Sequence, residues 1–136
     1  MSEIRATTIS DSAGTGPITL TGQSAAKAWV NFDGTGTIAS RDSFNVSGLT
    51  DHAGGQYSVT VVSSFDNANY SVCANCSTEA GTNTGKIAMI FTSHTGADPV
   101  APTASNFRIS SVRTGLTDAA EVDNPYNTAS AFGDLA

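Results

Sequence analysis

Residues 27–51 read KAWVNFDGTGTIASRDSFNVSGLTD, and their pattern predicts two strands joined by a tight turn. In the first limb, Val30 and Phe32 lie on one side of a period-2 pattern, as in a strand with one buried face. The run DGTG at 33–36 supplies two glycines, which tolerate the positive φ that a chain reversal needs. We therefore predict a hairpin with a return limb over residues 37–46. Its turn contains Asp33, Gly34 and Gly36.

A third strand is predicted after the hairpin. The polar run at 51–55 ends the return limb, and in residues 56–62 the side chains of Tyr57, Val59 and Val61 alternate with polar ones. Strands that follow one another through short turns most simply pair in sequence. The three strands are therefore expected to form a meander.

Further strands are predicted along the rest of the chain. Residues 86–91 (KIAMIF) form the most continuously apolar run, which is typical of a strand covered on both faces. Residues 70–74, 106–113 and 126–132 complete the set, with loops between them. About seven or eight short antiparallel strands predict a single all-β domain, a β-sandwich or jelly-roll-like barrel. The predicted core comprises Trp29, Val30, Phe32, Phe44, Val46, Tyr57, Val59, Val61, Ile87, Ile90, Phe107 and Ile109.

The first 26 residues differ from the rest, because they are polar and small with only isolated large aliphatic side chains. Residues 1–26 are predicted to form an extended arm that docks onto a neighbouring subunit, and residues 27–136 the sandwich. The alternative is an edge strand that packs on its own sheet. The arm's candidate contact residues are Ile4, Ile9, Ile18 and Leu20.

Composition restricts the function classes. A chain of 136 residues suits one domain with a real core. Its 12 acidic and 6 basic residues give a net charge of −6, which disfavours nucleic acid as a partner. No apolar run reaches the roughly 18 residues of a membrane span, and the N-terminus lacks the pattern of a secretory signal. We expect a soluble protein made in a cytosol, with no membrane partner.

Few residues suggest chemistry. Cys73 and Cys76 form a lone C-x-x-C, whereas a zinc site needs a second ligand pair, and His52 and His94 are both isolated. Positions three apart on a strand point to opposite faces, which also disfavours a disulfide. Free thiols are the preferred interpretation, with a disulfide or a metal as alternatives. His52 is interpreted as a turn residue and His94 as a loop residue.

Other side chains offer binding chemistry that has a structural alternative. Asp33, and the group Asp66, Asn67 and Asn69, could offer oxygen ligands to calcium, but Asx turns explain both better. No G-x-S-x-G elbow is present. We therefore expect no catalytic residues, no metal and no cofactor.

Aromatic residues raise one further possibility. Trp29, Phe32 and Tyr57 could form a platform on which sugar rings stack, but their place on strands favours core packing.

Several segments resemble a small β-rich module of structural proteins of tailed bacteriophages, notably phages of marine bacteria. The resemblance rests on KAWVNFDGTGT at 27–37, FNVS at 44–47, DNANY at 66–70 and AFGD at 131–134. It covers roughly residues 23–136, with a looser match over 73–123. The resemblance implies a virion component, often of the tail fibre, and it implies no catalytic residues.

Two functions from different classes follow as expectations. The first is a capsid decoration, or cement, protein on the virion surface. It would be assembled in the host cytoplasm as a homo-oligomer, most simply a trimer, and would bind the major capsid protein or other virion proteins. The second is a tail-fibre or head-fibre module that recognises a host-surface glycan through the loops at 77–85 and 92–105. The chain lacks the coiled coil or repetitive shaft of a fibre, which favours the first.

Overall fold

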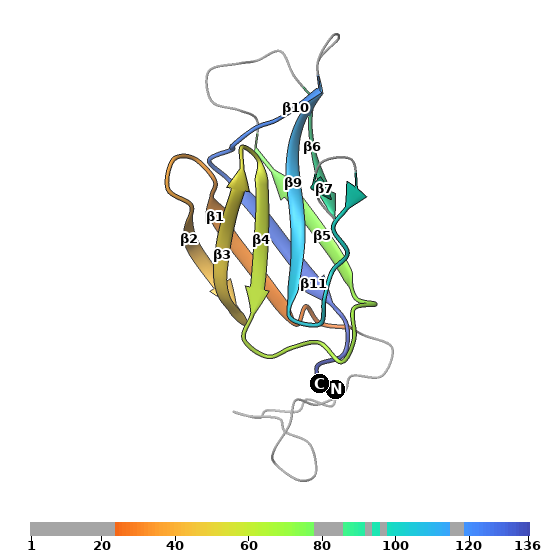
Figure 1. Cartoon of the computed structure of the whole chain (residues 1–136). Coiled ribbons are helices and arrows are strands. Elements are labelled where there is room, and N and C mark those ends of the chain that lie inside the picture. Colours follow the sequence, from red (N-terminus) through yellow and green to blue (C-terminus); the bar gives the residue numbers. More distant parts are fainter. Residues whose placement is uncertain (1–23, 78–85, 92–93, 96–97, 115–118) are drawn as a thin grey trace, which may run out of the picture.

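The computed structural model describes residues 24–77, 86–91, 94–95, 98–114 and 119–136, and in these residues every regular element is a β-strand. Two antiparallel sheets pack face to face as a β-sandwich (Figure 1), which confirms the predicted fold class. The strands are β1 (Ala28–Asp33), β2 (Ala39–Phe44), β3 (Val46–Ala53), β4 (Gln56–Val61), β5 (Ser71–Cys76), β6 (Lys86–Phe91), β7 (His94–Thr95), β8 (Asp98–Pro99), β9 (Asn106–Thr114), β10 (Ala119–Glu121) and β11 (Asn127–Phe132).

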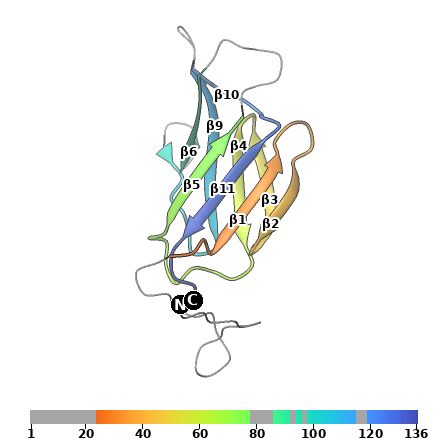
Figure 2. The same cartoon turned by 180° about the vertical axis from the view of Figure 1, so that it is seen from behind.

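The two sheets differ in size and order. The four-stranded sheet has the order β2-β1-β11-β5 (Figure 2). The five-stranded sheet has the order β10-β9-β4-β3, and β6 also pairs with β9. Strands β7 and β8 form a small separate hairpin inside the predicted loop at 92–105, and β10 lies inside the predicted loop at 115–125. Those two loops are therefore more regular than their sequences indicate.

The predicted hairpin exists, but the predicted meander is wrong. Strands β1 and β2 pair across the turn, and Gly36 has the positive φ of 63° that the sequence indicates. The return limb ends at Phe44, because Asn45 takes a left-handed φ of 55° and turns the chain into the other sheet. Strand β3 then continues through residues 51–53, which were predicted to close the limb. As a result β4 pairs with β3 and β9, not with β2.

Asn45 is well suited to this crossing. Asn is among the few residues that adopt the left-handed region readily. Its Nδ2 donates to the carbonyls of Lys27 (2.9 Å) and Ser63 (3.1 Å), and its Oδ1 accepts from the amide of Ser63 (2.7 Å). One side chain thus joins the start of β1 to the segment after β4.

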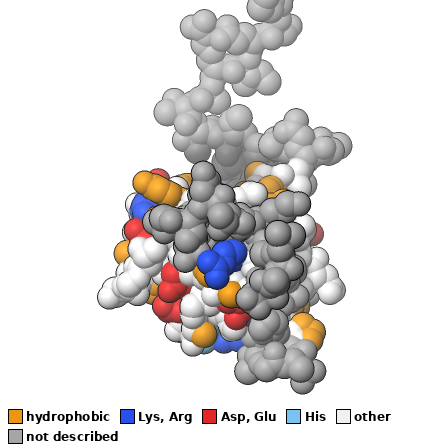
Figure 3. Space-filling model, turned by 90° about the horizontal axis from the view of Figure 1, so that it is seen from above, with side chains coloured by type: hydrophobic (Ala, Val, Ile, Leu, Met, Phe, Trp, Pro, Cys, Tyr) orange, Lys and Arg blue, Asp and Glu red, His pale blue; other side chains and the backbone are white. Residues whose placement is uncertain are grey.

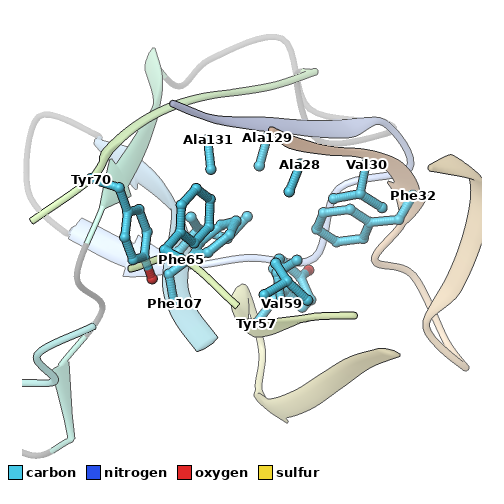
Figure 4. Packing of buried hydrophobic residues seen from close by; sticks show 12 residues of the cluster. Ala28, Val30, Phe32, Tyr57, Val59, Phe65, Tyr70, Phe107, Ala129 and Ala131 are labelled. Atoms are coloured by element: carbon cyan, nitrogen blue, oxygen red, sulfur yellow. The ribbon is translucent and has the colours of Figure 1, made fainter. Parts of the chain in front are cut away.

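The core lies between the sheets (Figure 4). Phe32 meets Tyr57 edge to face, with ring centroids 5.0 Å apart, and Phe65 stacks on Tyr70 at 4.1 Å. Small alanines from the four-stranded sheet lie between these aromatic groups. The buried cluster is Ala28, Val30, Phe32, Tyr57, Val59, Val61, Phe65, Tyr70, Phe107, Ile109, Ala129 and Ala131.

Most of the predicted core is confirmed, and two of its members are wrong. The confirmed residues are Val30, Phe32, Tyr57, Val59, Val61, Phe107 and Ile109, and Val46 is half-buried against them. Trp29 is exposed because β1 turns Ala28, Val30 and Phe32 inward, and Phe44 is 55% exposed because it lies opposite Trp29 on the same outer face. The side chains of Ile87 and Ile90, and the arm residues Ile4, Ile9, Ile18 and Leu20, lie outside the described part of the chain.

Candidate functional site

A buried polar cluster beside Tyr57 holds the segment before β11 in place. The Tyr57 hydroxyl donates to Oδ1 of Asp123 (2.8 Å), and the amide of Gly55 donates to the same oxygen (2.6 Å). Burial, followed by the hydrogen bond to Asp123, raises the pKa of Tyr57, so the phenol stays protonated as a donor.

Further contacts extend this cluster. Gln56 donates to Glu121, Asn124 donates to Ser111, and Asn127 Nδ2 donates to the carbonyl of Asn124 (2.7 Å). These hydrogen bonds tie the cluster to the framework, while Oδ1 of Asn124 and Oδ1 of Asn127 are buried and accept none.

The side chains with metal or redox potential are dispersed. Cys73 and Cys76 are free thiols on opposite faces of β5, as predicted, and Cys76 is half-buried against Ser111. His52 is not in a turn, because it lies on β3 with Nε2 2.7 Å from the Ser58 hydroxyl. Burial lowers the pKa of His52. Within the described residues, no cluster of His, Cys, Asp and Glu is suited to hold a metal ion.

The oxygen-bearing turn residues adopt the predicted Asx turns. Asp33 Oδ1 accepts from the amide of Thr35 (3.0 Å), and Asn67 Oδ1 accepts from the amide of Asn69 (2.7 Å). Hydrogen bonds from Thr35 also hold the pKa of Asp33 below its usual value. These carboxylate and amide oxygens thus accept hydrogen bonds within their own turns.

The outer face of the four-stranded sheet carries exposed aromatic side chains. Trp29 and Phe44 are direct cross-strand partners, and Trp29 also lies opposite Ser130 of β11. Trp29 is 36% exposed and Tyr126, just before β11, is 60% exposed. We call Trp29, Phe44 and Tyr126 the aromatic face. Large apolar side chains on a surface often mark a contact site.

A charged group lies at the Tyr126 side of this face. The Arg41 guanidinium carbon is 4.5 Å from the centroid of the Tyr126 ring, and an Arg41 nitrogen is 2.7 Å from Oδ2 of Asp33. Cation–π and ion-pair contacts together fix the orientation of the Arg41 side chain. Seen from above, acidic and basic side chains lie near one another at this end of the sandwich (Figure 3).

A groove lies between the edge strands β2 and β3, where the two sheets separate. Strands β2 and β3 are joined at Asn45 but belong to different sheets, and a cavity of about 200 Å³ lies between them. The space is open to solvent, and its volume is sufficient for aliphatic side chains. We call it the edge groove. Its lining residues are Ile38, Ser40, Ser43, Val46, Ser47, Gly48 and Leu49.

The sequence of β2 explains why this groove is not filled. Ser43 pairs with Val30 and Ser40 pairs with Phe32, so both serines lie on the inner side of the sheet, where they are exposed at its edge. Their small side chains leave space where a sandwich normally has large apolar ones. On the opposite wall, Val46 and Leu49 are only half-buried.

The two strands beside the groove are also sheet edges. Among the described residues, β2 pairs only with β1, and β3 pairs only with β4. An edge strand leaves alternate backbone N–H and C=O groups available to another strand. The edge groove therefore combines three aliphatic side chains, set among serines and a glycine, with two strand edges that pair with no further strand in the described part of the chain.

Comparison with known proteins adds no family to this description. No protein-family model, curated protein or solved structure matches the chain. In the described part of the chain, no helix is long and apolar enough to cross a membrane.

Core packing, which the sequence favours over a sugar-stacking platform for Trp29, Phe32 and Tyr57, is confirmed for two of the three. Phe32 and Tyr57 are buried, whereas Trp29 is exposed beside Phe44. The signal was present in the sequence, since a residue between Ala28, Val30 and Phe32 must point outward when those three point inward. The edge groove could not be found in this way, because it depends on the crossing at Asn45.

Proposed function

We propose that this chain is a structural protein of the virion surface of a tailed bacteriophage, and that it decorates the capsid through contacts between subunits. The observation that carries the proposal is the edge groove, beside which edge strands of both sheets pair with no further strand in the described part of the chain. A site of this kind suits the addition of an extended segment, in which main-chain hydrogen bonds give affinity and side-chain pockets give specificity. Such a segment can belong to another protein subunit of the particle.

The chemistry of the chain supports this setting. The resemblance of residues 27–37, 44–47, 66–70 and 131–134 to phage structural modules points to a virion. A net charge of −6 suits a protein that lies outside a DNA-filled shell better than one that binds the DNA. Repetition of one modest contact over a symmetric lattice gives strong attachment through multivalency.

An add-back assay tests the proposal. Particles assembled without this protein are incubated with the purified chain, separated by sedimentation and analysed for bound protein. We expect saturable binding and an increase in the temperature at which the particles release DNA. A chain that stays in the supernatant would contradict the proposal.

A second candidate function is recognition of a host-surface glycan. The specific observation is the cross-strand pair of Trp29 and Phe44, because exposed aromatic rings stack against the apolar faces of sugars. The pair lies on a sheet face that also presents hydroxyl groups, including that of Ser130. This site differs from the loops at 77–85 and 92–105 that the sequence suggested for the same function.

Glycan binding is tested separately from particle binding. The purified chain is applied to an array of bacterial surface glycans, together with the variants Trp29→Ala and Thr128→Ala. Both side chains lie on the outer face of the same sheet, so Thr128→Ala is the matched control. We expect Trp29→Ala alone to abolish a glycan signal, and a signal unaffected by Trp29→Ala would exclude the aromatic face.

A further inference from the structure

The edge groove has the shape and chemistry of a site for one extended strand. Ile38, Val46 and Leu49 supply apolar surface, and the inward-facing serines of β2 leave the space above it. The edges of β2 and β3 lie on either side and pair with no further strand among the described residues, although the Ser43 amide donates to Oδ1 of Asp42 (2.8 Å). An occupant must therefore be extended, must present apolar side chains at every second position and must tolerate polar surroundings on its other face.

One segment of this chain has that pattern. Residues 17–21 read PITLT, so in an extended conformation Ile18 and Leu20 point to one side and Thr19 and Thr21 to the other. Ile and Thr are β-branched and favour strands, and Pro is acceptable at the first position of a strand. This segment lies among the first 23 residues, which precede the described part of the chain.

The described chain enters β1 from the β11 side of the four-stranded sheet. The Lys27 amide donates to the carbonyl of Ala131 (2.8 Å), which ties the chain to β11 just before β1 begins. Residues 24–27 run beneath the end of β11, on the side of β1 opposite to β2 (Figures 1 and 2). Leu20 and Ile18 precede Ser24 by four and six residues, so in an extended chain they lie at most about 20 Å from it. That reach extends beyond this end of the sandwich to a copy that packs against it.

We propose that residues 17–21 of one copy insert as a strand into the edge groove of a second copy, with Ile18 and Leu20 in contact with Ile38, Val46 and Leu49. This inference rests on the proposed function only for its setting, the repeated copies on one particle. It adds the identity of the segment that occupies the groove. The inserted segment and the groove that receives it are different surfaces, so each contact is heterologous. Such contacts either link several copies into a closed ring or occur twice in a dimer, in which each copy inserts its segment into the other.

The test uses the purified full chain and measures its mass in solution by light scattering. The variant Ile18→Asp/Leu20→Asp places two charges on the inserting face, and we expect it to be monomeric where the unaltered chain is an oligomer. The matched control Thr19→Asp/Thr21→Asp adds the same charges to the other face and should remain an oligomer. All four positions precede the described sandwich, so the sandwich is expected to fold in both variants.

A second pair of variants tests the acceptor. Ser43→Leu fills the groove and should also give a monomer, whereas Thr128→Leu places the same side chain on the outer face of β11 and should not. Circular dichroism checks that each variant is folded.

Mixing the two monomeric variants decides between exchange and self-insertion. Ile18→Asp/Leu20→Asp retains an intact groove and Ser43→Leu retains an intact arm, so together they should form a complex that neither forms alone. A monomeric unaltered chain, an oligomer that persists in Ile18→Asp/Leu20→Asp, or a mixture without a complex would each overturn the inference. No particle is present in this experiment. A negative result here would therefore leave the add-back assay unaffected, and a negative add-back assay would leave this experiment unaffected.

Discussion

Replacing Gly34 by alanine tests the packing of the hairpin turn against the buried polar cluster. Gly34 is buried, and an added Cβ would lie 2.7 Å from Cζ of Tyr57, nearer still to its hydroxyl, and 3.0 Å from Nδ2 of Asn127. Real Cβ atoms do not approach carbon so closely, so Tyr57 or the turn must move. Tyr57 is not free to do so, because its hydroxyl donates to Asp123.

The expected cost follows from these two effects. Overpacking of a well-packed core costs about 1 to 3 kcal/mol. A hydrogen bond to a charged group contributes about 1.5 to 3 kcal/mol, and a displaced Tyr57 would lose part of it. We expect Gly34→Ala to lower the free energy of unfolding by about 3 kcal/mol, which for a domain of this size lowers Tm by about 10 °C.

Chemical denaturation monitored by Trp29 fluorescence measures this loss. Gly48→Ala is the control, because a Cβ there has no neighbour within 4 Å, and we expect a change within about 0.5 kcal/mol. Tyr57→Phe in the Gly34→Ala background should cost less than the sum of the two single changes, since the clash with the hydroxyl is gone. If Gly34→Ala unfolds at the same denaturant concentration as the unaltered chain, the placement of Tyr57 beneath the turn is wrong.

Three further predictions concern the crossing between sheets, the thiols and the response to pH. Asn45→Ala should destabilise the fold by about 3 kcal/mol, because it combines left-handed backbone strain with the loss of three hydrogen bonds. Asn45→Gly loses the same hydrogen bonds without the strain and should cost less. Equal losses of unfolding free energy in chemical denaturation would contradict the role of the backbone conformation. A maleimide should label exposed Cys73 faster than half-buried Cys76, whose pKa is raised by burial, and Cys73→Ser should remove the fast phase. Burial raises the pKa of Tyr70 from 10.0 to about 12, so its contribution to stability is complete below pH 10.0 and is lost as the pH rises through about 12. The midpoint of unfolding should therefore fall over that interval, and less so in Tyr70→Phe.

Local pattern predicted much of this fold. Alternation identified β1, β4, β5 and β9, and a continuous apolar run identified β6. The same alternation should have placed Trp29 outside, but its size suggested the core. The size and hydrophobicity of Trp29 therefore led to a wrong prediction, although the alternation of β1 already placed its side chain on the outer face.

Sheet partners were less predictable, because they depend on a single residue. Asn45 changes the sheet to which the chain belongs, and a left-handed Asn has no distinctive neighbourhood in the sequence. Phe65 lies between two predicted strands among polar neighbours, yet it is buried because the C-terminal segment pairs with it at Leu135. The edge groove arises from the same non-local arrangement, so it could not be inferred from residues 37–49 alone.

The copy number of this protein in purified virions tests the central claim most directly. Quantitative mass spectrometry compares peptides of this chain with those of the major capsid protein. A capsid decoration protein should be present in a fixed, high ratio to the capsid subunits, as its repeated contacts require. A few copies per particle would place the protein at the tail or a unique vertex and favour the glycan-binding function of the aromatic face. Absence from virions would contradict both.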